Sequence, residues 1–201
     1  MSHTKEGHPL PGRIMHYVNL LSMVLLVGTG LFIHKPNFSL FGLDMNTVRY
    51  LHFIFGFVLM LNALVRVYWS IFGKPRDVRY FLPERENKGT LFSMAAYYLF
   101  LRKTHPTTSK YNPLQKITYV SWAVGILLMG ITGFAMLWKT NPFWSWVVDL
   151  FGGLVMIHVV HYLLTWFFVV TVLIHAYLSV FEDFRAFLLM FFGIELEEDA
   201  H

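Results

Sequence analysis

Three histidines lie in one apolar stretch of the chain between Gly153 and Phe181, at His158, His161 and His175. This stretch is long enough to cross a bilayer as a helix, which takes about 20 predominantly apolar residues. An imidazole inside a membrane is costly, so such a residue indicates a functional site. His161 and His175 are fourteen residues apart, so on a helix both rings leave the same face, roughly 21 Å apart along the axis. Two ligands at two depths of one helix predict two stacked cofactors.

The composition is that of an integral membrane protein. The 201 residues are 56% hydrophobic and only 14% charged, whereas soluble domains carry about 25% charged residues. The net charge of +4 does not indicate nucleic-acid binding, because the basic residues cluster in one connecting segment, as membrane topology requires. The chain has no cysteine, which excludes disulfides, cysteine-held iron–sulfur clusters and thiol chemistry on it.

The hydrophobic pattern predicts an all-α protein with one membrane domain over residues 1–201. Because lipid cannot satisfy exposed backbone groups, each span must be a helix. The expected spans cover residues 14–33, 50–72, 117–138 and 154–181.

The segment 73–116 between the second and third spans holds most of the basic residues. Positive residues stay on the cytoplasmic side, so this segment and both termini are expected in the cytoplasm, with the chain in the inner (cytoplasmic) membrane. Within it, residues 90–103 read as an amphipathic helix lying at the inner interface, and 184–194 are similar.

Two further histidines match the depths of the first pair. His16 lies just inside the inner end of span one, level with His175, and His52 lies just inside the outer end of span two, level with His161. Two neutral imidazoles on one metal suit a low-spin b-type haem, whose role is electron transfer because no axial position stays open. Zinc would require further ligands. Core histidines hydrogen-bonded across helices are the other reading, and two depth-matched pairs count against it.

Three more residues are candidates for contacts with these predicted cofactors. His158, one turn before His161, is an alternate outer ligand, or contacts a haem propionate or a partner at the outer surface. His34 is interfacial or contacts a propionate. Arg66 follows His52 by fourteen residues and so lies at the inner depth. It needs an anion there, such as a propionate of the inner haem, or else it extends to the headgroups.

Several sequence pieces together carry a resemblance to a known family. The pieces are RIMHYVNLLSM from Arg13, VRYLHFIFGFVLMLNALVRVYW from Val48, YYLFLRK from Tyr97, YNPLQKITY from Tyr111, ITGFAM from Ile131 and HYLLTWFFVVTVLIHAY from His161. With them the chain resembles the cytochrome b subunits of membrane-bound nickel–iron hydrogenases, and more distantly the gamma subunit of respiratory formate dehydrogenases.

The resemblance implies a four-helix bundle holding two b haems, ligated by His16, His52, His161 and His175. It also implies an iron–sulfur subunit of a hydrogenase or similar dehydrogenase on the outer face. Electrons would then pass through the outer and inner haems to a quinone near the cytoplasmic side. The sequence departs from the hydrogenase branch at Tyr162, where that branch often has a basic residue or histidine.

Asn112 and Gln115, at the cytoplasmic entry to span three, can donate hydrogen bonds to a quinone carbonyl. In the formate branch this segment helps to form the quinone site. The pair Asn112–Pro113 also reads as a helix start, with asparagine as N-cap and proline in the first turn.

Other functions stay open at this point. A membrane subunit of a formate dehydrogenase or a sulfur-compound reductase could use the same bundle, because the partner determines the substrate. A haem-free membrane anchor would not require paired histidines. A transporter with a histidine proton relay is expected to show broken helices or internal repeats, and neither is evident in the sequence.

Overall fold

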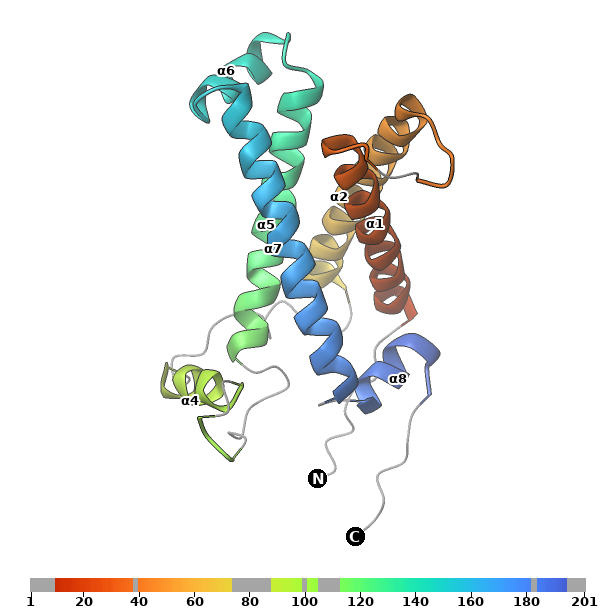
Figure 1. Ribbon diagram of the computed structural model, residues 1–201. Coiled ribbons are helices and arrows are strands. Elements are labelled where there is room, and N and C mark those ends of the chain that lie inside the picture. Colours follow the sequence, from red (N-terminus) through yellow and green to blue (C-terminus); the bar gives the residue numbers. More distant parts are fainter. Residues whose placement is uncertain are drawn as a thin grey trace. The chain divides into compact units, whose positions relative to one another are not determined.

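The computed structural model describes residues 10–37, 40–73, 88–98, 101–104, 113–181 and 184–194, and all regular structure in these ranges is α-helical (Figure 1). Four helices are long and apolar enough to cross a membrane: α1 (Leu10–His34), α2 (Met45–Phe72), α5 (Pro113–Leu137) and α7 (Leu154–Phe181). Each of the four predicted spans therefore coincides with a helix that could cross a membrane. Three shorter helices join or follow them: α4 (Lys88–Tyr98), α6 (Pro142–Leu150) and α8 (Phe184–Phe192).

The long helices extend beyond the predicted spans at several ends. α1 and α2 begin four and five residues early, at Leu10 and Met45, because a helix continues past the apolar run that a bilayer requires. α5 begins at Pro113, so the connection predicted over 73–116 is shorter than expected. Proline favours the first helical position because its missing N–H has no partner there in any case.

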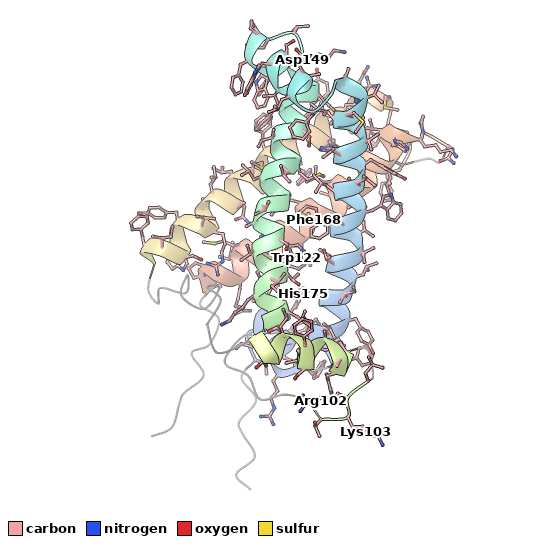
Figure 2. The ribbon with its side chains drawn as sticks, turned by 90° about the vertical axis from the view of Figure 1, so that its left-hand side faces the viewer. Arg102, Lys103, Trp122, Asp149, Phe168 and His175 are labelled. Carbon is pink, nitrogen blue, oxygen red and sulfur yellow. The ribbon has the colours of Figure 1, made fainter. Side chains whose placement is uncertain are left out.

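The helix predicted over residues 90–103 was placed too far along the chain. α4 covers Lys88–Tyr98, and the two cations Arg102 and Lys103 lie beyond its end (Figure 2). The backbone N–H groups of Leu101 and Arg102 both donate to the carbonyl of Ala96, at 2.8 and 3.2 Å. This turn satisfies a carbonyl that the helix end leaves open, so the cations follow the helix instead of continuing it.

The helix α6 was not predicted, although its start has a clear sequence signal. Asn141 is the N-cap and its side chain accepts a hydrogen bond from the Phe143 N–H at 3.0 Å, while Pro142 takes the first position. Gly152 and Gly153, at φ +86° and +102°, then turn the chain into α7. These φ values strain any residue with a Cβ atom, which explains the two adjacent glycines.

The helices fall into two compact units. The first comprises Met1–Asn62 and Tyr162–His201, and so holds α1, most of α2, most of α7, and α8. The second comprises Ala63–His161 and holds the rest of α2, α4, α5, α6 and the first part of α7.

In the second unit, α5, α6 and the start of α7 share a small apolar core. Ala135, Val147 and Ile157 form its centre. Elsewhere the long helices expose large apolar side chains, for example Leu64 on α2 and Leu163 on α7, at 65% and 61% exposure. Such surfaces suit contact with lipid tails better than contact with water.

In the first unit, side chains near the N-terminal end of α1 form hydrogen bonds with the C-terminal end of α8 (Figure 1). The Arg13 Nε donates to the carbonyl of Met190 at 3.1 Å, and the Tyr17 hydroxyl donates to the carbonyl of Phe191. The last carbonyls of a helix have no partner within it, and a cation near them is favourable. This contact therefore docks α8 beside the first turns of α1.

Candidate functional site

His52 is half-buried on α2, and its ring is held by α1. The His52 Nδ1 lies 2.9 Å from the Thr29 Oγ1, and that same Oγ1 lies 2.6 Å from the carbonyl oxygen of Leu25. A carbonyl can only accept, so the single hydroxyl proton of Thr29 points to Leu25. Toward the imidazole the hydroxyl must accept, which places the ring proton on Nδ1. The neutral ring then keeps its lone pair on Nε2, where a metal can bind.

His161 on α7 has the same arrangement with α5. Its Nδ1 lies 2.8 Å from the Thr132 Oγ1, which donates to the carbonyl of Leu128 at 2.8 Å. Thr132 is fully buried, at 0% exposure, so this hydroxyl does not exchange its partners with water. By the same reasoning the proton lies on Nδ1, and Nε2 carries the lone pair.

A glycine follows each of these threonines and lies against the held ring. A Cβ atom at Gly30 would lie 3.1 Å from the His52 Cε1, closer than nearly all real contacts of this kind. A Cβ at Gly133 would lie 3.7 Å from the His161 Cε1, which is ordinary contact. Both imidazoles therefore pack edge-on against a helix backbone that has no side chain at that point.

His16 on α1 and His175 in the later part of α7 both belong to the first unit. They lie within electrostatic range of each other. The edge of Phe191 meets the face of His16, with ring centroids 5.5 Å apart at 87°, so α8 borders this pair. The His16 Nδ1 is buried and has no hydrogen-bond partner among the described residues. Figure 2 labels His175 on α7.

The remaining candidates lie as follows. His158 is exposed on α7, and its Nδ1 donates to the carbonyl of Leu154, one turn back, at 2.7 Å. His34, at the end of α1, stacks on Tyr162 with ring centroids 4.5 Å apart at 22°. A ring from α1 thus covers Tyr162.

Arg66 is half-buried on α2 and donates from Nη1 to the Ser70 Oγ at 2.6 Å. A hydroxyl is uncharged, so this bond orients the guanidinium without neutralising it. Gln115 lies half-buried in the first turn of α5. Asn112, the other predicted quinone contact, lies outside the described residues.

Comparison with known proteins places the chain in a family. The family model described as prokaryotic cytochrome b561 matches residues 7–193, which is most of the chain. The chain belongs to this family. As a member of the cytochrome b561 family it is a multi-pass membrane protein with haem b as its cofactor and electron transfer in the membrane as its role.

The curated relatives carry a common description, and they share their similarity over most of their length. A probable Ni/Fe-hydrogenase B-type cytochrome subunit of Azotobacter vinelandii is 35% identical over 190 residues, covering 86% of this chain and 79% of the relative. A protein of the same description in Cupriavidus necator is 30% identical, covering 86% and 78%. The probable Ni/Fe-hydrogenase 1 B-type cytochrome subunit of Escherichia coli K12 is 29% identical, covering 86% and 81%.

The histidines of this cytochrome b561 family member fit a haem. A haem iron takes its in-plane ligands from the macrocycle and needs at most two from the protein. His52 and His161 are in the tautomer that offers Nε2, and the buried His16 Nδ1 has no hydrogen-bond partner in the described part of the chain. Neutral imidazole nitrogens are also the donor type that haem iron accepts.

The sequence pattern did not predict Thr29 and Thr132 as contacts of the histidines. A signal for them exists, because the dipeptide Thr–Gly occurs at 29–30 in one span and at 132–133 in another. What the sequence does not contain is the rotation of each helix toward its neighbour, which puts both hydroxyls against an imidazole.

Proposed function

We propose that this protein is a dihaem b-type cytochrome subunit that passes electrons across the membrane to quinone. His52 and His161 are the axial ligands of the outer haem, and His16 and His175 those of the inner haem. Residues 1–201 act as one membrane domain with both termini and the 73–116 connection in the cytoplasm. The helix α4 then lies at the inner interface.

The observation that carries this proposal is the placement of His16 and His175 in the same unit. They are 159 residues apart in the sequence and belong to different helices, yet they lie within electrostatic range of each other. Depth matching in the sequence predicts this same pair. The threonine contacts support His52 and His161 as the outer ligands, because they place the ring proton on Nδ1 and leave the lone pair on Nε2.

His161 is a better outer ligand than His158 on the same grounds. The ring of His161 is held from a second helix by a buried hydroxyl. His158 is exposed, and its hydrogen bond to the Leu154 carbonyl joins it to its own helix. A ligand held by a second-shell partner keeps its orientation when the metal is bound. His158 is then available for a partner at the outer surface.

The electron donor is an iron–sulfur subunit of a nickel–iron hydrogenase. The relatives at 29–35% identity are described as Ni/Fe-hydrogenase B-type cytochrome subunits, which supports such a partner here. The bound haem supplies reversible one-electron transfer between Fe(III) and Fe(II). Reduction of a quinone takes two electrons and two protons, and Gln115 with Asn112 orients the quinone carbonyl by hydrogen bonding.

The haem content is tested by a visible spectrum and a haem-to-protein ratio of the purified protein. We expect two b haems per chain, and a colourless protein from haem-replete cells would refute the proposal in favour of a membrane anchor. In the His175→Met variant we expect the inner haem alone to change. Equal loss of both haems would contradict the pairing of ligands.

The electron donor and the membrane topology are tested in membranes. Co-purification with a hydrogenase and hydrogen-dependent reduction of the b haems would support the hydrogenase donor. Formate-dependent reduction instead would assign the chain to a formate dehydrogenase. Reporter fusions at each terminus and in the 73–116 connection should all report the cytoplasmic side, and an outer location of either terminus would overturn the topology.

A further inference from the structure

Two parts of the chain repeat one local arrangement around a histidine. In each, a threonine on one helix donates to the carbonyl one turn back and meets the Nδ1 of a histidine on the next long helix. The two distances from oxygen to Nδ1 are 2.9 and 2.8 Å. In each, the residue after the threonine is a glycine whose missing side chain faces the ring Cε1.

We propose that Thr29 and Thr132 are positioning residues that set the protonation and donor strength of His52 and His161. This rests on the proposed function, because it takes these histidines as ligands of the outer haem. Each threonine hydroxyl accepts the Nδ1 proton, which leaves the lone pair of the neutral ring on Nε2. Neither threonine touches the iron, so each acts only through its histidine.

The chemical consequence follows from the direction of these hydrogen bonds. An N–H that donates to an oxygen gives the imidazole more anionic character and makes Nε2 a stronger donor to the metal. A stronger donor favours Fe(III), so both bonds lower the reduction potential of the outer haem.

His16, a proposed ligand of the inner haem, differs in this respect. Its buried Nδ1 has no hydrogen-bond partner among the described residues, so the structure gives it no hydroxyl of this kind. Both proposed ligands of the outer haem, by contrast, have one. A lower potential outside than inside makes transfer from the outer to the inner haem downhill.

The test uses Thr→Val variants, because valine keeps the branched shape and loses only the hydroxyl. In Thr29→Val and Thr132→Val we expect the midpoint potential of the outer haem to rise, or that haem to be partly lost, while the inner haem keeps its potential. Thr29→Ser and Thr132→Ser restore the hydroxyl and should restore the parent behaviour. The component that disappears in His52→Ala identifies the outer haem in redox titrations.

Thr118 supplies the matched control. Its hydroxyl donates to the Leu114 carbonyl at 2.9 Å, the same bond one turn back on α5, with no histidine in its described contacts. Thr118→Val should leave both haems unchanged. If it shifts the outer haem as much as Thr132→Val does, the effect comes from the helix backbone and the inference fails.

The remaining outcomes separate this inference from the proposed function. Should the parent protein bind two haems whose potentials and spectra are the same in both Thr→Val variants, the positioning role is wrong and the dihaem function stands. A shift of both haems by the same amount would also overturn it, as a general packing effect. If the parent protein binds no haem, the proposed function and the inference fail together.

Discussion

Asn62 connects α2 to α1 beside the inner histidines, and its substitution has a measurable cost. Its side-chain Nδ2 donates to the backbone carbonyl of Met15 at 2.8 Å and to the Asn19 Oδ1 at 2.7 Å. The amide nitrogen has two protons, so each bond uses one of them. Met15 directly precedes the proposed ligand His16, which places this bridge next to the inner site.

The magnitude follows from the number of bonds. Hydrogen bonds between membrane helices contribute on average about 0.6 kcal/mol each, with a maximum near about 1.7 kcal/mol. Asn62→Leu loses both bonds, so we expect the free energy of unfolding to fall by about 1.2 kcal/mol. Asn19→Leu loses one bond and should cost about 0.6 kcal/mol by the same value.

The double variant makes the prediction sharp. Once Asn62 is leucine, Asn19 has already lost this partner, so adding Asn19→Leu should cost almost nothing further. The two single costs then exceed the double cost by about 0.6 kcal/mol, which is the coupling energy of the pair. Detergent-micelle unfolding monitored by circular dichroism measures all four proteins. The bridging role of Asn62 would be refuted if the cost of the double variant equalled the sum of the two single costs. It would also be refuted if Asn62→Leu were as stable as the parent protein.

Further predictions concern a helix cap, a core residue and a pair of glycines. The Thr47 hydroxyl donates to Asp44, the N-cap of α2, and holds the pKa of that carboxyl below its usual value. A carboxyl with a depressed pKa stabilises the fold above its unfolded pKa. The stability advantage of the parent over Asp44→Asn should therefore shrink below about pH 4, which thermal melts across pH 3–7 would measure. Ile157 is fully buried in the core of the second unit, so Ile157→Ala should cost about 2–5 kcal/mol in micelle unfolding, and a cost under that range would mean that the core collapses around the gap. Gly30→Ala places a Cβ 3.1 Å from the His52 ring, whereas Gly133→Ala is in ordinary contact at 3.7 Å; haem retention should therefore fall more in Gly30→Ala, and the reverse order would contradict the described packing.

Much of the fold could be predicted from the sequence because hydrophobicity determines a membrane helix directly. A bilayer requires about 20 apolar residues in each span, and the four predicted spans all occur as helices. The short helices depend on caps and turns instead. The helix α6 begins at an asparagine–proline pair, and α4 ends where two N–H groups turn back to one carbonyl, so composition alone misplaced or missed them.

The sequence by itself determined the family, the membrane spans and the depth of each histidine, because depth follows from the rise per residue along a helix. It did not determine the side of each helix that faces a neighbour, because that rotation results from packing between residues far apart in the chain. Only the tertiary structure brought Thr29 to His52 and Thr132 to His161. These contacts decide which ring nitrogen of His52 and His161 carries the proton, and they show how two of the candidate haem ligands are held.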